Sequence, residues 1–277
     1  MASVLIDTKL VGVTPAIAKE WAAMKKTKGE RDLRPARVEW LRRLVDRGEF
    51  TTCTWARVLF QDTYERLDGW HSSAMLAQLP PVQFPPKQKA LIETWSAETL
   101  EEVALLFLRF NNPLSTRTQA EAYKAMAGAI PRLAHIPKNL LSYIMAGIVN
   151  TLEGKHRPRF ADQKLALMHE YPDFIRWAEA FVVAPHMRRA ATVGAMLLTF
   201  RRDKADAADF WGQIREGENA GQPATKTRDY LLKLGGSREK VSPRELRGRC
   251  IHGWNAFRSS QRTTLRYYVD KPDPQIV

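Results

Sequence analysis

Residues 67–76 read Leu67-Asp68-Gly69-Trp70-His71-Ser72-Ser73-Ala74-Met75-Leu76, and the interpretation of the N-terminal half depends on this stretch. The apolar run before it, at 55–60, predicts a strand, and the polar residues 61–64 predict a turn. After Gly69 the apolar spacing becomes helical, with Ala74, Leu76 and Leu79 near one face. A strand, a tight Asp-Gly turn and the N-terminus of a helix are therefore expected in this order.

The predicted helix start after Gly69 has the chemistry of a phosphate-binding site. Main-chain N–H groups in the first turn of a helix have no intrahelical partner and lie at the positive end of the helix dipole. Ser72 and Ser73 add hydroxyl donors, and His71 adds a donor whose charge changes near neutral pH. A purely structural interpretation also fits, in which Asp68-Gly69 is an ordinary turn and Ser72 caps the helix.

The composition indicates a globular protein with excess positive charge. The 277 residues are 44% hydrophobic and 26% charged, enough for one large domain or two medium ones. The net charge of +13 indicates a polyanionic partner, nucleic acid before membrane, because no lipid-anchor motif is visible; the alternative is a basic protein that is merely soluble. Cys53 and Cys250 form no paired motif, and there is no signal peptide or apolar run of about 18 residues, so a reducing cytoplasm is expected.

Helix start and stop signals divide the rest of the N-terminal half into short elements. Thr14-Pro15 is typical of a helix start, Leu33-Arg34-Pro35 precedes a second helix, and the proline pairs at 80–81 and 85–86 predict a stiff connector. The pattern predicts strands at 4–13 and 90–95, helices beginning near 15 and 35, a helix at 99–110, and a helix from 118 to about 126 capped by Ser115 or Thr116.

Arginines recur along the second predicted helix and after the Asn-Pro break at 112–113. Such a set is usually a solvated face, but it also suits a nucleic-acid backbone, and Arg37 is the candidate DNA contact within it. Arg117 is a second candidate phosphate contact, because its guanidinium can bind phosphate through two parallel hydrogen bonds. The arginines of the second helix are Arg34, Arg37, Arg42, Arg43 and Arg47.

From about Gly128 the sequence predicts helices throughout, with apolar stripes at 140–148, 174–181 and 193–200. The C-terminal residues are basic and interleaved with aromatics, a pattern in which cations follow phosphates and aromatic rings stack on bases. The alternative is a basic surface on a terminal helix whose aromatics are core. The candidate DNA-binding residues are Arg244, Arg247, Arg258, Arg262 and Arg266, near Arg249, Trp254, Phe257, Tyr267 and Tyr268.

Several segments together resemble a known family. The resemblance rests on 13–15 (VTP), 37–38 (RV) with 48–50 (GEF), 67–71 (LDGWH), the spacing Asn111…Arg117-Thr118…Glu121, and 253–257 (GWNAF). In this pattern the chain resembles the ParB/sulfiredoxin-fold proteins of phages and plasmids, of the type with a D-G-Q-H-R-L loop. The specific motifs lie mostly in the first hundred or so residues, although the resemblance spans most of the chain.

The resemblance implies a phosphate-binding loop, holding a nucleotide or DNA, with particular roles for its residues. It implies catalytic roles for Asp68 and His71, and phosphate or nucleotide binding by Gly69, Trp70, Ser72, Ser73, Arg117 and Thr118. The chain departs from the family pattern at two places. Ser72 stands where the family has Arg, which removes a bidentate phosphate clamp. Trp70 stands where the family has Gln, and it either stacks on a base or belongs to the core. The sulfiredoxin cysteine is also absent from the loop, so sulfinic-acid repair is not expected.

Signals for metals and for other catalytic motifs are weak. Cys250-x-His252 lacks two further ligands at a standard spacing, so no structural zinc is expected. One or two of the acidic residues near the loop suit Mg²⁺ bound together with a phosphate, although Asp68 more simply fixes the turn. These acidic residues are Asp62, Glu65, Asp68 and Glu93, and no Ser-His-Asp or Walker-type motif is visible.

The sequence thus predicts an α+β protein, with a small ParB/sulfiredoxin-like domain at 1–127 and a basic, mainly helical domain at 128–277. The leading hypothesis is a DNA-binding protein of a mobile element, cytoplasmic in a bacterial host, that acts on or modifies DNA through a degenerate phosphate-binding loop. One alternative is a nucleotide-dependent enzyme: a nuclease, a kinase-like phosphotransferase or a base-modifying transferase. The other is a binding module without chemistry. The cofactor and the oligomeric state are left open, with a nucleotide and Mg²⁺ as the candidate that the enzyme hypothesis implies.

Overall fold

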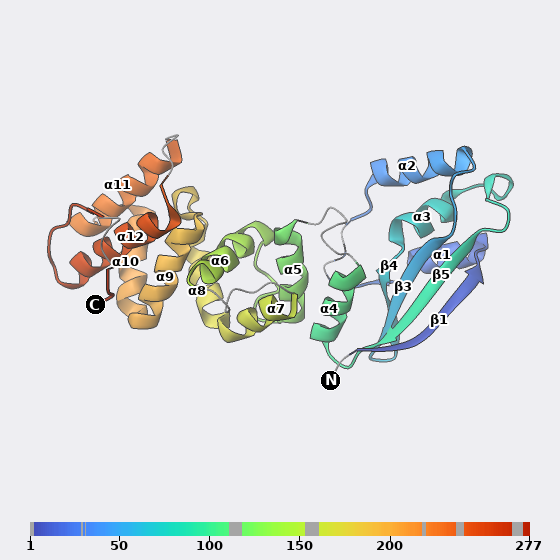
Figure 1. The fold of residues 1–277 in the computed structure, drawn as a ribbon, viewed down its shortest axis with the longest axis horizontal. Helices are drawn as coiled ribbons and strands as arrows, with labels where there is room; N and C mark the ends of the chain where they lie inside the picture. Colours follow the sequence, from blue (N-terminus) through green and yellow to red (C-terminus); the bar gives the residue numbers. More distant parts are fainter. Residues whose placement is uncertain are drawn as a thin grey trace. The chain divides into compact units, whose positions relative to one another are not determined.

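The computed structural model describes residues 3–28, 30, 32–110, 118–152, 161–217, 220–236, 241–267 and 274–277. The chain forms two compact units, Met1–Pro131 and Arg132–Val277. All the strands of the described residues lie in the first unit, and the second is built of helices (Figure 1). The predicted α+β class, with a sheet at the N-terminal side and helices at the C-terminal side, is confirmed. We call the two parts the sheet unit and the helical unit.

The sheet unit contains a mixed five-stranded sheet in the order β1-β5-β3-β4-β2. β1 and β5 are antiparallel, β5 and β3 are parallel, β3 and β4 are antiparallel, and the short β2 runs parallel to β4. The predicted strands at 4–13, 55–60 and 90–95 correspond to β1, β3 and β5. The bounds are β1 Val4–Gly12, β2 Lys25–Lys26, β3 Cys53–Phe60, β4 Thr63–Asp68 and β5 Lys89–Ser96.

Strand β4 and the turn before it correct the sequence-based expectation. The predicted turn at 61–64 contains only Gln61 and Asp62, whose φ angles of 49° and 58° suit a two-residue hairpin turn that follows the twist of the sheet. Thr63 and Tyr64 already belong to β4. The strand that leads into Gly69 is therefore β4, the hairpin partner of β3, and not the strand at 55–60.

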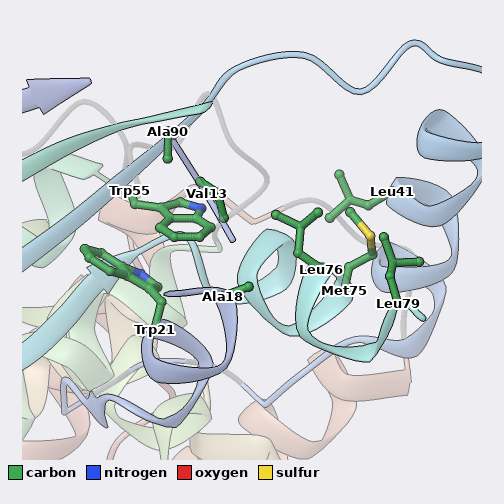
Figure 2. Packing of buried hydrophobic residues seen from close by; sticks show 9 residues of the cluster. All are labelled: Val13, Ala18, Trp21, Leu41, Trp55, Met75, Leu76, Leu79 and Ala90. Carbon is green, nitrogen blue, oxygen red and sulfur yellow. The ribbon is translucent and has the colours of Figure 1, made fainter. Parts of the chain in front are cut away.

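Three helices make one layer of the sheet unit, and a tryptophan pair joins one of them, α1, to the sheet. α1 (Pro15–Ala23) begins at Thr14, whose hydroxyl accepts from the Ile17 N–H, as the Thr-Pro signal predicts. Trp21 of α1 stacks on Trp55 of β3 with ring centroids 5.0 Å apart. Figure 2 shows this pair on one side of the cluster, and Leu41 of α2 (Pro35–Asp46) against α3 (Trp70–Gln78) on the other.

The opposite face of the sheet is covered by α4 (Leu100–Phe110), which packs with α5 (Gln119–Ala129). Strand β3 has the two-residue period of a strand buried on both sides, because Trp55 belongs to the α1–α3 cluster and Ala56 to the α4 cluster. α5 starts at Thr118, which forms a capping box with Glu121. The N-cap is thus Thr118 and not Ser115 or Thr116, which lie outside the described residues together with Arg117.

The helical unit packs around α9 (Ala190–Arg202), which contacts α6, α8, α10 and α12. α6 and α9 approach closely, because a Cβ on Gly147 would overlap the side chain of Val193. No helix of the described residues is long and apolar enough to cross a membrane. The other bounds are α6 Lys138–Asn150, α7 Ala161–Glu170, α8 Pro172–Val182, α10 Lys204–Glu216, α11 Gln222–Gly236 and α12 Pro243–Arg258, with short 3-10 turns at Pro81–Gln83 and Pro185–Met187.

Candidate phosphate-binding site and basic surface

The Asp68-Gly69 turn joins β4 to α3 and requires glycine for two reasons. Gly69 is the N-cap residue of α3 and has φ of +98°, a conformation that residues with a side chain rarely adopt. A Cβ at this position would also overlap Cδ1 and Cγ of the Trp55 ring. Since α3 begins at Trp70, Ser72 lies inside its first turn, and the expectation that Ser72 caps this helix is wrong.

The serine hydroxyls of the loop are used within the protein. Ser72 Oγ donates to the Gly69 carbonyl at 3.0 Å and accepts from Trp55 Nε1 at 2.8 Å. Ser73 is buried, and its Oγ donates to the Trp70 carbonyl at 3.0 Å. Asp68 Oδ1 accepts from the Gly69 N–H at 2.7 Å. These bonds fix the turn and use the hydroxyl protons of both serines. A ligand here would therefore bind to main-chain N–H groups of the first turn.

Three helix N-termini meet at Arg34. Arg34 is the N-cap residue of α2, and its N–H donates to Nε2 of His71, in the first turn of α3, at 3.2 Å. Its guanidinium, half exposed, lies 3.8 Å from Glu121 in the first turn of α5. Glu121 also accepts from the Thr118 N–H at 3.1 Å. Thr118 is thus linked to the loop only indirectly, through Glu121 and Arg34. Arg34 therefore contacts the first turn of α3 through its main chain and the first turn of α5 through its side chain, where the Glu121 carboxylate offsets its charge.

Trp70 is not a core residue, and its ring is not freely available for stacking on a base. The side chain is half buried, and Lys26 Nζ lies 3.9 Å from the centroid of its ring. The Arg66 guanidinium carbon lies 4.9 Å from the same centroid. A cation held over an indole is attracted by the negative face of the ring. Any base that stacked on Trp70 would compete with Lys26 for that face.

Arg66 is a structural residue that sequence reasoning did not single out. It is completely buried in β4, where it makes a bidentate ion pair with Glu30 at 3.1 and 3.0 Å. Its Nη1 donates to the carbonyls of Trp21 and Ala22, at the C-terminal end of α1. An arginine within the polar run TYERLD carries no sequence signal for burial, so only the fold reveals this role.

In the described part of the chain, the thiol near the loop is not activated and no metal cluster is found. Burial raises the pKa of the Cys53 thiol to about 11, with a smaller contribution in the same direction from the negative charge of Asp68. A thiol of this kind stays protonated and is a poor nucleophile. The four acidic residues considered for Mg²⁺ are dispersed: Glu65 is paired with Lys25 at 2.6 Å, Glu93 accepts from Trp95, and Asp62 lies in the exposed hairpin turn. No group of three or more potential ligands forms among the described residues.

The C-terminal arginines divide into engaged and unengaged side chains. Arg247 donates to the carbonyl of Asn150 at 2.9 Å, and Arg258 pairs with Asp203 at 3.0 Å and with Asp206 at 2.8 Å. Arg244 is exposed in the first turn of α12. Arg262 and Arg266 are exposed as well, and no hydrogen bond or ion pair joins either of them to the residues that the structure describes.

The segment 261–267 that carries Arg262 and Arg266 is held firmly. Gln222, at the start of α11, exchanges two hydrogen bonds with the backbone of Thr263, at 2.9 and 3.0 Å. Arg249 of α12 donates to the carbonyl of Leu265, whose side chain is buried. These two guanidinium groups, which have no partner among the described residues, therefore belong to an anchored backbone, which lowers the entropy cost of binding through them.

The aromatic residues of the C-terminal region belong mostly to the core. Trp254 is fully buried, and Phe257 packs against it and against Phe210. Trp254 thus has no face available for stacking on a base. Tyr268 lies outside the described residues. An exposed aromatic is found instead on α2, where Trp40 is 45% exposed and the Arg37 guanidinium carbon lies 4.2 Å from its ring centroid.

The positive charge is concentrated in the helical unit. The sheet unit, 1–131, has 18 Lys and Arg against 15 Asp and Glu, a net charge of +3. The helical unit, 132–277, has 25 against 15, a net charge of +10. The sheet unit is therefore close to neutral, with local cations around the start of α3, while the helical unit is strongly basic.

Comparison of the chain with protein-family models, with curated proteins and with solved structures gives no match. The site has to be interpreted from its own chemistry.

Proposed function

We propose that this protein binds DNA, with the helical unit providing most of the electrostatic attraction. The observation that carries the proposal is the +10 charge of that unit, together with two exposed arginines on its anchored segment 261–267 that have no partner among the described residues. Lysine and arginine side chains that replace the counterions of a phosphate backbone supply affinity for DNA without sequence preference. Arg247 and Arg258 contribute indirectly, because their hydrogen bonds hold the helices in place.

The start of α3 has a narrower role in this proposal, which is to contact a single phosphate. The family arginine is replaced by Ser72, but Arg34 contacts His71 of the same helix start through its main-chain N–H, and its guanidinium lies beside Glu121 at the start of α5. The N-terminus of α3 favours an anion. The resemblance to ParB/sulfiredoxin-fold proteins supports this assignment and, with it, an origin in a phage or plasmid and a bacterial cytoplasm as the place of action.

Binding without chemistry fits the loop better than catalysis does. A catalytic base needs an available lone pair, and His71 Nε2 already accepts the Arg34 N–H. The Asp68 carboxylate is likewise engaged by Gly69. The enzyme alternative is favoured by one observation: Arg34, which contacts His71 in the loop, also contacts Glu121, the capping partner of Thr118. Saturable binding of ATP or CTP that is lost in His71→Ala would support that alternative.

The DNA proposal predicts a particular change in salt dependence. In an anisotropy titration of a duplex over a salt series, the double variant Arg262→Ala/Arg266→Ala should lower the slope of log Kd against log salt by about 2, or about 1 for each lost phosphate contact. The matched control is Lys19→Ala/Lys87→Ala, which removes the same charge from two exposed lysines of the sheet unit. Equal slopes for the two double variants, or no binding by the parent protein, would contradict the proposal.

The same titration tests the start of α3 through Arg34→Ala. This change removes the guanidinium but keeps the main-chain N–H that His71 accepts, so the loop geometry is preserved. We expect a slope lower by about 1 and an equal loss of affinity for different DNA sequences. A variant with the slope of the parent protein would remove the phosphate contact from the proposal and leave the role of the helical unit intact.

A further inference from the structure

Strand β1 is an edge strand with an unusually apolar, exposed surface. It is nine residues long and, within the described part of the chain, pairs on one side only, with β5. Val4, Leu5, Ile6 and Leu10 are between 46% and 60% exposed. Edge strands of monomeric proteins are normally short, charged, bulged or covered, because their free N–H and C=O groups otherwise pair with another chain. Although β1 contains a bulge near Ile6, its length and apolar exposure suit a partner strand.

The register with β5 assigns the side chains of β1 to the two faces of the sheet. Thr8 is opposite Glu93 and Leu10 is opposite Leu91, on the same face as Trp95, which packs in the α4 cluster. Asp7 and Lys9 are opposite Thr94 and Ile92, on the other face. Asp7 and Lys9 form an ion pair of 2.6 Å along the strand, and the side chain of Lys9 is 71% exposed. The outer edge of β1 thus presents Leu5 and Leu10 on one face and the charge pair on the other.

We propose that β1 pairs antiparallel with β1 of a second copy of this chain, around a twofold axis at Thr8. In this register Asp7 lies opposite Lys9 of the second copy, and Lys9 lies opposite its Asp7. Ile6 lies opposite Leu10 in the same way. Each carboxylate is then next to two ammonium groups, one from each chain, and Ile6 and Leu10 of the two copies cover each other. The contact is isologous and closes at two copies, forming one continuous sheet.

Neighbouring registers lack this charge complementarity. With the twofold axis perpendicular to the sheet, residues on the same face stand opposite each other. An axis at Asp7 would place two carboxylates opposite each other, and an axis at Lys9 would place two ammonium groups opposite each other. Like charges directly opposite one another destabilise a strand pair. The order Asp7-Thr8-Lys9 therefore selects a single twofold register for this edge.

A standard protein–protein interface buries about 1,600 Å² in total. Contact through one strand edge buries less than this, so the dimer should be weak and depend on concentration. Sedimentation velocity of the full-length protein over a concentration series is the suitable measurement. The parent protein should shift reversibly from monomer to dimer as its concentration rises. A monomer at every concentration, or growth into species larger than a dimer, overturns the proposal.

A charge exchange tests the register itself. Asp7→Lys should abolish the dimer, because two positive side chains then face each other across the twofold axis. The double variant Asp7→Lys/Lys9→Asp reverses both members of the pair and should restore the dimer at the net charge of the parent. Glu20→Lys, an exposed site on α1 with the same charge change as Asp7→Lys, is the control and should dimerise like the parent. A double variant that stays monomeric, or a single variant that dimerises normally, contradicts the register.

Discussion

At the scale of single residues, the candidate phosphate site depends on the absence of a side chain at Gly69. Gly69→Ala should cost about 1 kcal/mol for the positive φ and a further ~1–3 kcal/mol for the overlap with Trp55. Gly48→Ala is the matched control, because Gly48 has φ of +68° but no atom near the place of a Cβ. Urea unfolding of both variants measures the difference. If both lose equal stability, the close approach of Trp55 does not constrain the turn.

The residues of the site were predictable from sequence to different degrees. The Asp-Gly turn and the helix after it could be predicted, because a turn dipeptide followed by helical apolar spacing is a local pattern. The inward orientation of Ser72 and Ser73 could not be predicted, since it depends on Trp55 in a different strand. Arg34 was grouped with the arginines of a helix face, yet it contributes through its main-chain N–H, which no side-chain pattern reports.

At the scale of elements, β4 escaped sequence-based prediction because its buried positions are charged. Glu65 and Arg66 are buried, and their charges are compensated by Lys25 and Glu30, residues in a distant part of the sequence. A strand is normally recognised by apolar alternation, which ion-paired residues do not show. By contrast, β1, β3, β5 and α1 follow local rules of alternation and capping, and the sequence placed them within a few residues of their bounds.

Arg66 links two elements, so its removal should destabilise the sheet unit as a whole. Arg66→Ala leaves Glu30 without this partner, frees the last carbonyls of α1, and should cost about 3 kcal/mol or more. Arg43→Ala is the control, because Arg43 forms an exposed pair with Glu39 within one helix and should cost under ~0.5 kcal/mol. Chemical denaturation gives both values. A loss for Arg66→Ala no larger than that of the control would show that the buried ion pair does not hold α1 to β4.

At the scale of the whole molecule, the sequence predicted the distribution of charge better than the contacts of each charged side chain. The net charge and its C-terminal excess are properties of the sequence, and the structure places +10 of the +13 in the helical unit. Which arginine side chains are available for binding could not be predicted, because the local sequence does not distinguish Arg258 from Arg262. Arg258 faces two carboxylates at the start of α10, whereas Arg262 faces none among the described residues. The distinction depends on tertiary contacts that no spacing rule encodes.

Each unit also has one thiol, half-buried Cys53 and buried Cys250, and these predict how the stability of the molecule changes with alkaline pH. Burial raises the pKa of Cys53, in the sheet unit, to about 11 and that of Cys250, in the helical unit, to about 12. The unfolded chain ionises these thiols near pH ~8.5, so their contribution to stability is complete below that pH and is lost progressively as the pH rises towards the folded-state values. Thermal unfolding from about pH 7 to about pH 10 should therefore show a steeper loss in the parent than in Cys250→Ala. Tyrosines and lysines also titrate in this range, but they are common to both proteins and cancel in the comparison. Identical pH profiles for the two proteins would show that Cys250 is not held as a buried neutral thiol.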